Sequence, residues 1–154
     1  MKRIMFVCHG NICRSPMAEF VFKRMVDERG LSGDFLIASS ATSTEEIGNP
    51  VYPPARRELL SHGISPDGKY AVQLSRSDYG KYDLFVGMDS ANVRNMHRMF
   101  GTDPDAKIKK LLDYTSRGGD VADPWYTGDF KLTYRDVKDG CEALLNKILE
   151  EGDI

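Results

Sequence analysis

The sequence of 154 residues has few cysteines, little net charge and no long hydrophobic run. Its 21 basic and 23 acidic side chains leave a net charge of −2 at pH 7, and no basic stripe stands out. Nucleic-acid binders neutralise phosphates with clustered Lys and Arg, so this balance argues against that class. No stretch approaches the roughly 18 consecutive apolar residues of a membrane-spanning helix. Met1–Arg3 leads directly into an apolar run, which leaves no room for a cleavable signal peptide, so we expect a cytoplasmic protein.

The chain has only three cysteines, Cys8, Cys13 and Cys141. They show no C-x-x-C spacing and no paired histidine ligands, which argues against a zinc site and against a disulfide framework. We therefore expect no bound metal. A reducing compartment suits a thiol that must stay unoxidised in order to react.

Apolar strand-like runs alternate with helical patterns, which favours an α/β fold in three layers: a four-stranded parallel sheet with helices on both faces. The hydrophobic content of 41% and the charged content of 29% are those of a globular protein, and we expect a single domain over residues 1–154. The strands are predicted at Arg3–Val7, Phe35–Ala38, Asp83–Gly87 and Lys107–Leu112. The helices are predicted at Ser15–Arg29, Pro53–His62, Ser90–Met99 and Tyr134–Leu149, with a loop at Asp113–Asp129.

The segment Cys8–Ser15, C-H-G-N-I-C-R-S, joins the first predicted strand to the first predicted helix. Such a loop makes an anion site, because its amides and the positive end of the helix dipole face one spot. The loop begins with the thiol of Cys8 and ends with the guanidinium of Arg14, whose planar fork matches two oxygens of a tetrahedral oxyanion. These groups indicate covalent chemistry on a phosphate, in a phosphate-binding loop after the first strand.

Cys8 is the candidate nucleophile. The loop amides, the helix terminus and Arg14 all favour its thiolate form, and Ser15 is placed to donate a hydrogen bond to the sulfur. The alternative is that Cys8 is a small buried apolar residue at a strand end. A cation such as Arg14 is disfavoured in the first turn of a helix, because the helix dipole is positive there. A bound dianion would offset both positive charges. Gly10 and Asn11 tolerate left-handed backbone, which lets the loop curl, although Asn11 as a simple turn former fits equally well.

Ligands of open α/β sheets bind outside the carboxyl ends of the strands. In the predicted fold, the thiol loop meets two other segments there, Ser39–Thr42 and the Met88–Asp89 corner. Asp89 or Ser90 is expected to cap the helix that follows. This placement leaves the thiol loop where a substrate can reach it.

The run C-H-G-N-I-C-R-S-P-M-A-E resembles the amino-terminal signature of the low-molecular-weight protein tyrosine phosphatases. The similarity continues in that family's order and spans most of the chain, through Ser39–Pro50, His62–Ile64, Met88–Asn92 and Asp123–Tyr126. The N-I-C-R-S-P form with a late D-P-W-Y is far more specific than Cys-x5-Arg alone. The resemblance implies a hydrolase of phosphotyrosine in proteins and peptides that needs no metal or organic cofactor, and we expect a monomer.

The resemblance also implies a mechanism. Cys8 attacks phosphorus to give a phosphocysteine intermediate, while Arg14 and the amides of residues 9–14 hold the phosphoryl oxygens. Asp123 protonates the leaving phenolate and then activates the water that hydrolyses the intermediate. Taken alone, Asp123 followed by Pro124 is an ordinary turn pair, and the amino-terminal loop is what favours the acid interpretation. Pro124 restricts the backbone at Asp123 and helps to aim the carboxylate.

Other positions of the family pattern are expected to line or support the pocket. Trp125 and Tyr126 offer flat faces to a phenyl ring, with packing over a loop as the alternative for Trp125. Ser39 matches a serine that supports the loop asparagine, and Asp89 matches an acidic residue near the site whose simpler explanation is a helix cap. The substrate-binding residues are predicted to be His9, Gly10, Asn11, Ile12, Cys13, Ser15, Glu45, Trp125 and Tyr126.

Some positions either depart from the family pattern or have an open role. Cys13 matches a thiol that in the family pairs with the nucleophile under oxidants, and a packed neutral thiol is an equal alternative. Glu45 falls where many members carry an aromatic residue, and His9 falls where an aliphatic residue is usual. Lys69 falls near the place of a family histidine. We expect these departures to bear on specificity and pH dependence rather than on the reaction type.

Two other functions fit parts of the sequence. An arsenate reductase shares the fold and the Cys-x5-Arg loop, but it needs two further thiols on a nearby mobile segment to relay oxidation. Residues 60–100 contain no cysteine, which argues against that function. An inactive phosphopeptide-binding module needs neither a nucleophile nor an acid, so the presence of Cys8, Arg14 and Asp123 together argues against it.

Overall fold

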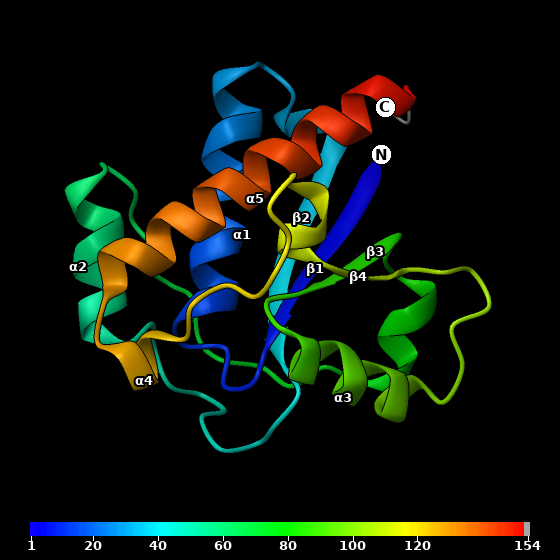
Figure 1. Cartoon of the computed structure of the whole chain (residues 1–154), viewed down its shortest axis with the longest axis horizontal. Coiled ribbons are helices and arrows are strands. Elements are labelled where there is room, and N and C mark those ends of the chain that lie inside the picture. Colours follow the sequence, from blue (N-terminus) through cyan, green and yellow to red (C-terminus); the bar gives the residue numbers. More distant parts are fainter. Residues whose placement is uncertain (153–154) are drawn as a thin grey trace.

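A computed structural model describes residues 1–152 and contains a four-stranded, all-parallel sheet in the order β2-β1-β3-β4 (Figure 1). This sheet confirms the α/β fold predicted from the alternating patterns. The strands are β1 (Lys2–Cys8), β2 (Phe35–Ala41), β3 (Leu84–Gly87) and β4 (Ile108–Lys110). The helices are α1 (Arg14–Glu28), α2 (Pro53–Ser61), α3 (Ser90–Phe100), α4 (Pro124–Thr127) and α5 (Phe130–Glu151). Short 3-10 turns are η1 (Ser32–Asp34), η2 (Arg76–Gly80) and η3 (Leu111–Tyr114).

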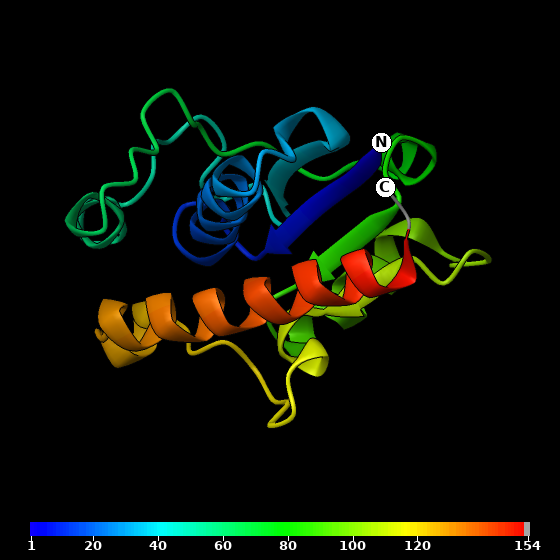
Figure 2. The ribbon, with the colours of Figure 1, turned by 90° about the horizontal axis from the view of Figure 1, so that it is seen from above.

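Alternate side chains of β1 point to opposite faces of the sheet, as the pleat requires. Ile4 and Phe6 are fully buried in a cluster with apolar residues of α1 and α5. Met5 and Val7 instead pack in a second cluster with residues of α3 and η2. Figure 2 shows α5 as one long helix that runs beside the strands. Helices therefore cover both faces, which explains why β1 reads as an unbroken apolar run.

The segment from β4 to α5 departs from the predicted elements. A strand was expected over Lys107–Leu112, but β4 ends at Lys110 and η3 follows. Both leucines of η3 are fully buried, so an apolar run that reads as strand packs as a 3-10 turn against α5. The predicted loop Asp113–Asp129 contains the short helix α4, and α5 starts at Phe130 instead of Tyr134. The Asp129 side chain accepts a hydrogen bond from Leu132 N at 3.0 Å and caps this earlier start.

The carboxyl ends of β1, β2 and β3 lie at one edge of the sheet, because the strands are parallel. β1 ends at Cys8 beside the end of β2 at Ala41, and β3 ends at Gly87. Two backbone hydrogen bonds join the segments that follow β1 and β2: Thr42 N donates to Cys8 O at 3.0 Å and Ser43 N to His9 O at 3.1 Å. None of the helices within residues 1–152 has the length and apolar character needed to cross a membrane.

Gly140 in α5 provides a test of the packing between α5 and η3. A methyl group added at Gly140 would overlap Leu111 Cγ and lie 2.9 Å from Leu111 Cδ2. We expect Gly140→Ala to lower the free energy of unfolding by about 1–3 kcal/mol, because overpacking outweighs the helix preference of Ala. Gly33→Ala is the control, since nothing lies within 4 Å of its added methyl. Denaturant unfolding measures both variants, and equal stability of the two would contradict this packing.

Candidate active site

The loop from Cys8 to Arg14 curls around the thiol of Cys8. Asn11 adopts a left-handed backbone conformation with φ 60°, whereas Gly10 keeps a negative φ. The turn brings Asn11 N to 3.3 Å from Cys8 Sγ, and Ser15 Oγ lies 3.0 Å from the same sulfur. The expected contact from Ser15 is thus present, and the left-handed residue is Asn11. The sulfur sits at the amino end of α1, where the first helical amides have no intrahelical partner.

Arg14 is the first residue of α1 and is buried, with 3% of its surface exposed. Its Nη1 lies 2.9 Å from Asp89 Oδ2 and donates to Val121 O at 3.1 Å, and its Nη2 lies 3.4 Å from Asp123 Oδ2. Burial on its own lowers the pKa of Arg14, but the negative charges of Cys8, Asp89 and Asp123 outweigh it and raise that pKa. The guanidinium is therefore permanently charged and held in place from two directions.

Asp89 has both of the roles considered for it. One of its oxygens, Oδ1, accepts from Asn92 N at 2.7 Å and caps α3. The other oxygen, Oδ2, pairs with Arg14. The cap and the ion pair are therefore not alternatives, because a carboxylate has two oxygens to share.

Polar side chains beneath the loop hold Asn11 in its conformation. Asn11 Nδ2 donates to Ser15 Oγ at 2.7 Å and to Ser39 Oγ at 3.0 Å, and Asn11 Oδ1 accepts from Val72 N at 3.1 Å. Ser39, expected to support the loop asparagine, contacts it directly. Asn11 is 1% exposed and Ser39 is 1% exposed, so these hydrogen bonds are shielded from water.

Glu19 is a member of this network that the sequence analysis missed. It is 5% exposed, accepts from Ser39 Oγ at 2.6 Å and pairs with Lys23 at 2.5 Å. Lys69 Nζ lies 3.8 Å from Glu19 Oε1 and donates to Ser39 O at 2.8 Å, and burial lowers the pKa of Lys69. An acidic residue in the otherwise apolar run M-A-E-F-V, four positions after Ser15, was the available signal, since i and i+4 share a helix face.

Asp123 precedes α4 and caps it. Its Oδ1 accepts from Trp125 N at 3.0 Å, and its Oδ2 faces Arg14. Its backbone is extended, with φ −86° and ψ 109°, as the following Pro124 favours. Trp125 lies with its ring centroid 5.1 Å from that of Tyr52, so it packs on the residue that precedes α2 and also lines the cavity. Tyr126 is 86% exposed at the rim.

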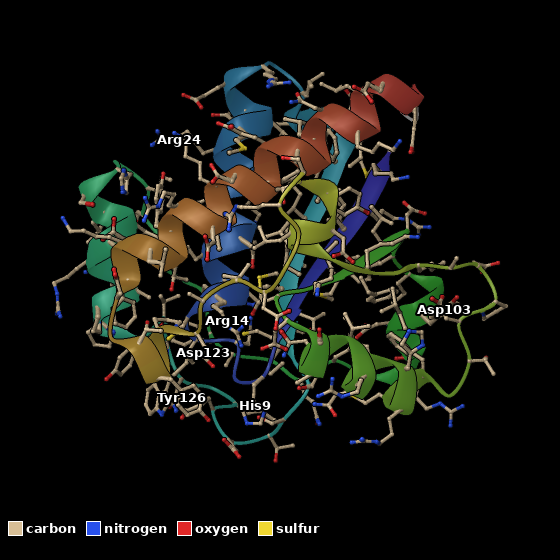
Figure 3. All side chains as sticks on the ribbon, in the orientation of Figure 1. His9, Arg14, Arg24, Asp103, Asp123 and Tyr126 are labelled. Atoms are coloured by element: carbon tan, nitrogen blue, oxygen red, sulfur yellow. The ribbon has the colours of Figure 1, made fainter. Side chains whose placement is uncertain are left out.

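These segments enclose a cavity of about 450 Å³, within the usual size range of small-molecule sites. Figure 3 shows Arg14 and Asp123 next to each other, with Tyr126 and His9 at the same end of the molecule. Ser15 and Ser39 lie beneath the cavity and not in its wall. Residues missed by the sequence analysis come from the loop after β2 and from α3. The lining residues are Cys8, His9, Gly10, Asn11, Ile12, Cys13, Arg14, Glu45, Glu46, Asp89, Ala91, Asn92, Asn95, Asp123, Trp125 and Tyr126.

The two departures at the rim contact each other. His9 Nε2 lies 3.0 Å from Glu45 Oε2, and both side chains are more than half exposed, at 56% and 68%. An exposed pair of this kind contributes little to stability, because water screens it. The pair forms a polar wall at the rim, at the two positions that the sequence analysis identified as departures from the family pattern.

The other two thiols differ from Cys8 in surroundings. Burial, together with the charge of Cys8, raises the pKa of Cys13 to about 12, which keeps that thiol neutral. Cys141 is fully buried between α5 and α1, with its Sγ 3.7 Å from Ala18 O. All three cysteines are free. Within residues 1–152 no group of three or more His, Cys, Asp or Glu side chains is placed to hold a metal ion.

Comparisons with known proteins show relatives that match most of the chain. The family model described as low molecular weight phosphotyrosine protein phosphatase matches residues 3–153. The chain is 40% identical to the low molecular weight protein-tyrosine-phosphatase YfkJ of Bacillus subtilis over 98% of both chains. The crystal structure of YfkJ superposes with a TM-score of 0.95, covering 98% of this chain and 96% of that one.

Two further relatives show the same likeness. The crystal structure of SP-PTP, the low molecular weight protein tyrosine phosphatase of Streptococcus pyogenes, has 42% identity and a TM-score of 0.87, covering 96% of this chain and 93% of that one. The low molecular weight phosphotyrosine protein phosphatase of Rattus norvegicus is 36% identical over 95% of both chains. The family match thus extends over almost the whole length of the chain. The chain belongs to the low molecular weight phosphotyrosine protein phosphatase family.

Proposed function

We propose that this protein hydrolyses phosphotyrosine in proteins and peptides through a phosphocysteine intermediate on Cys8. The observation that carries the proposal is the meeting of three groups in one cavity: the sulfur of Cys8, the guanidinium of Arg14 and the carboxylate of Asp123. A nucleophile, a bidentate cation and a proton donor are the groups that transfer of a phosphoryl group to a thiol requires.

The phosphoryl group binds in the loop between β1 and α1. Arg14 and the amides of residues 9–14 hold its equatorial oxygens, and the helix dipole of α1 adds to their attraction. Asp89 keeps the guanidinium in the cavity before the substrate arrives. This preorganised cradle stabilises the charge that redistributes over the oxygens in the transition state.

The first step forms the bond between Cys8 Sγ and phosphorus and breaks the bond between phosphorus and the phenolic oxygen. The electron pair of the breaking bond goes to that oxygen, which takes the proton of Asp123. In the second step the Asp123 carboxylate takes a proton from water, whose oxygen attacks phosphorus and displaces the Cys8 thiolate. Inorganic phosphate leaves, and Asp123 is protonated again for the next cycle. No metal ion or organic cofactor takes part.

The depth of the cavity supports a preference for aryl phosphates. Cys8 is 4% exposed at the base of the cavity, while Tyr126 and Trp125 stand exposed at its mouth. A long aryl spacer carries the phosphorus down to the sulfur, and the flat faces at the mouth suit its ring. We also expect a monomer that acts in the cytoplasm, where a nucleophilic thiol stays reduced.

The arsenate reductase alternative needs two relay thiols beside the nucleophile. The third cysteine, Cys141, is fully buried against Ala18 O in the core, and Cys13 is the remaining thiol in the cavity wall. The relay of an arsenate reductase ends in a disulfide at the surface, and no second relay thiol lies near Cys13 to form that disulfide. This arrangement favours hydrolysis over reduction.

We expect turnover of an aryl phosphate that persists in EDTA and is lost in Cys8→Ser. A hydroxyl in place of the thiolate is too weak a nucleophile, and no metal contributes. The measurement is release of p-nitrophenol from p-nitrophenyl phosphate. Activity that survives the Cys8 substitution, or that EDTA abolishes, would contradict the mechanism.

Asp123→Ala removes the proton donor and should lower kcat/KM for a phosphotyrosine peptide by about 10²–10⁴-fold. Asp113→Ala is the matched control, because Asp113 is exposed and lies outside the cavity. Initial rates at a series of substrate concentrations test both variants. An Asp123 variant that matches the control would exclude the general-acid role.

Paired peptides that differ only in phosphotyrosine or phosphoserine test the selectivity. We expect phosphotyrosine to be hydrolysed much faster, since phosphoserine is too short to bring its phosphorus to Cys8. The measurement is phosphate release from both peptides at equal concentration. Equal rates would refute the role assigned to the depth of the cavity.

A further inference from the structure

The segment that leads to Asp123 has no regular secondary structure of its own. It follows η3 and runs from residue 115 to residue 123, with Gly118 and Gly119 at φ 61° and 88°. A loop of this kind places a carboxylate poorly unless contacts from outside it restrain the backbone. The source of that restraint bears directly on how well Asp123 is aimed.

The two residues before Asp123 are restrained through their backbone groups. Val121 N donates to Met88 O at 2.9 Å, and Val121 O accepts from Arg14 at 3.1 Å. Ala122 N donates to Asp136 Oδ2 at 3.0 Å, and Ala122 O accepts from Thr133 Oγ1 at 2.9 Å. All four backbone polar groups of this dipeptide are therefore hydrogen-bonded to other parts of the fold.

Both contacts to Ala122 come from α5, where Thr133 and Asp136 lie three residues apart on one face. Thr133 is fully buried and Asp136 is 5% exposed. Asp136 Oδ1 also accepts from Arg117 at 2.9 Å, which ties the earlier part of the same loop to the helix. A buried carboxylate is costly unless it is paired and hydrogen-bonded, and here both of its oxygens are.

We propose that Asp136 and Thr133 are positioning residues that act through Asp123, fixing the backbone of Ala122, the residue that precedes the general acid. Neither side chain lines the cavity, so neither touches the substrate. Thr133 holds the peptide unit that joins Ala122 to Asp123, and Asp136 holds the preceding unit, from Val121 to Ala122, so both effects reach Asp123 along the backbone of Ala122. The inference rests on the proposed function, because it assumes that Asp123 is the proton donor.

A positioning role of this kind predicts a dependence on the leaving group. Protonation by Asp123 matters most when the departing oxygen is basic, as in phosphotyrosine, where the phenol has a pKa near 10. It matters less for p-nitrophenyl phosphate, whose phenol is more acidic. A misplaced Asp123 therefore lowers kcat/KM for the first substrate more than for the second, whereas general damage to the fold lowers both.

Asp136→Ala is the principal variant. We expect the ratio of kcat/KM for p-nitrophenyl phosphate to that for a phosphotyrosine peptide to rise on the order of ten-fold, because a displacement of about 1 Å costs up to 10²-fold. Asp139→Ala is the matched control: Asp139 lies on the same helix and contacts Arg117 at 3.4 Å but does not contact the backbone of Ala122. Its ratio should equal that of the wild type.

Thr133→Val tests the second contact and keeps the inference testable if Asp136→Ala does not fold. Valine retains the shape of threonine but cannot donate to Ala122 O. We expect the same selective change in the ratio, with the folded state checked by thermal unfolding. In an Asp123→Ala background neither substitution should change the ratio further, because the carboxylate through which both substitutions act is then absent.

An equal fall for both substrates in Asp136→Ala, or a change in ratio that persists without Asp123, would overturn the inference. A change in Asp139→Ala as large as that in Asp136→Ala would overturn it as well. If Asp136→Ala does not fold, an unchanged ratio in Thr133→Val overturns it. Failure of the wild type to hydrolyse either substrate would instead refute the proposed function itself.

Discussion

Placing a buried positive charge at the amino end of a helix is electrostatically costly, and the site depends on how that charge is balanced. Arg14 begins α1, where the helix dipole already repels a cation. Asp89, which follows β3 and caps α3, and Asp123 from the loop before α4 supply the opposing charge. These ion pairs bring segments from three parts of the chain to one cavity, and they hold the guanidinium where the proposed reaction needs it to bind a phosphoryl dianion.

A second set of buried polar contacts keeps the loop in shape beneath the cavity. The contacts run from Cys8 through Ser15, Asn11 and Ser39 to Glu19, each within hydrogen-bond distance of the next. Such a network is stable only when its members are satisfied, so it holds a single loop conformation. A left-handed Asn11 is a strained state for a residue with a side chain, and the three hydrogen bonds of its amide group offset that strain. Amides that are held rigidly around the sulfur need not reorient during a reaction, and this makes their electrostatic stabilisation of a transition state effective.

The departures from the family pattern fall into two different layers of the site. Lys69 lies in the buried layer, where its ammonium group donates to Ser39 O and faces Glu19. His9 and Glu45 lie on the exposed rim, where they pair with each other. The reacting groups lie between these layers. We therefore expect different residues to determine the reaction type and the fine selectivity.

The parts of the fold and site that the sequence predicted are those with a local signature. Strand-like apolar runs, the glycine after a helix and the spacing from Cys8 to Arg14 each depend on neighbours along the chain, and the four parallel strands and the first helix followed from them. Elements whose secondary structure depends on contacts distant in the sequence were mispredicted. Leu111 and Leu112, predicted as strand, form a 3-10 turn because they pack on α5. The contact of Glu19 with Ser39 and the hydrogen bonds to Ala122 were missed for the same reason, since the partners lie far away in the sequence. The chain alone thus determined which reactive groups are present and on which elements they sit. Only tertiary packing decided how they are oriented, because the direction of a buried carboxylate is set by the donors that folding brings to it.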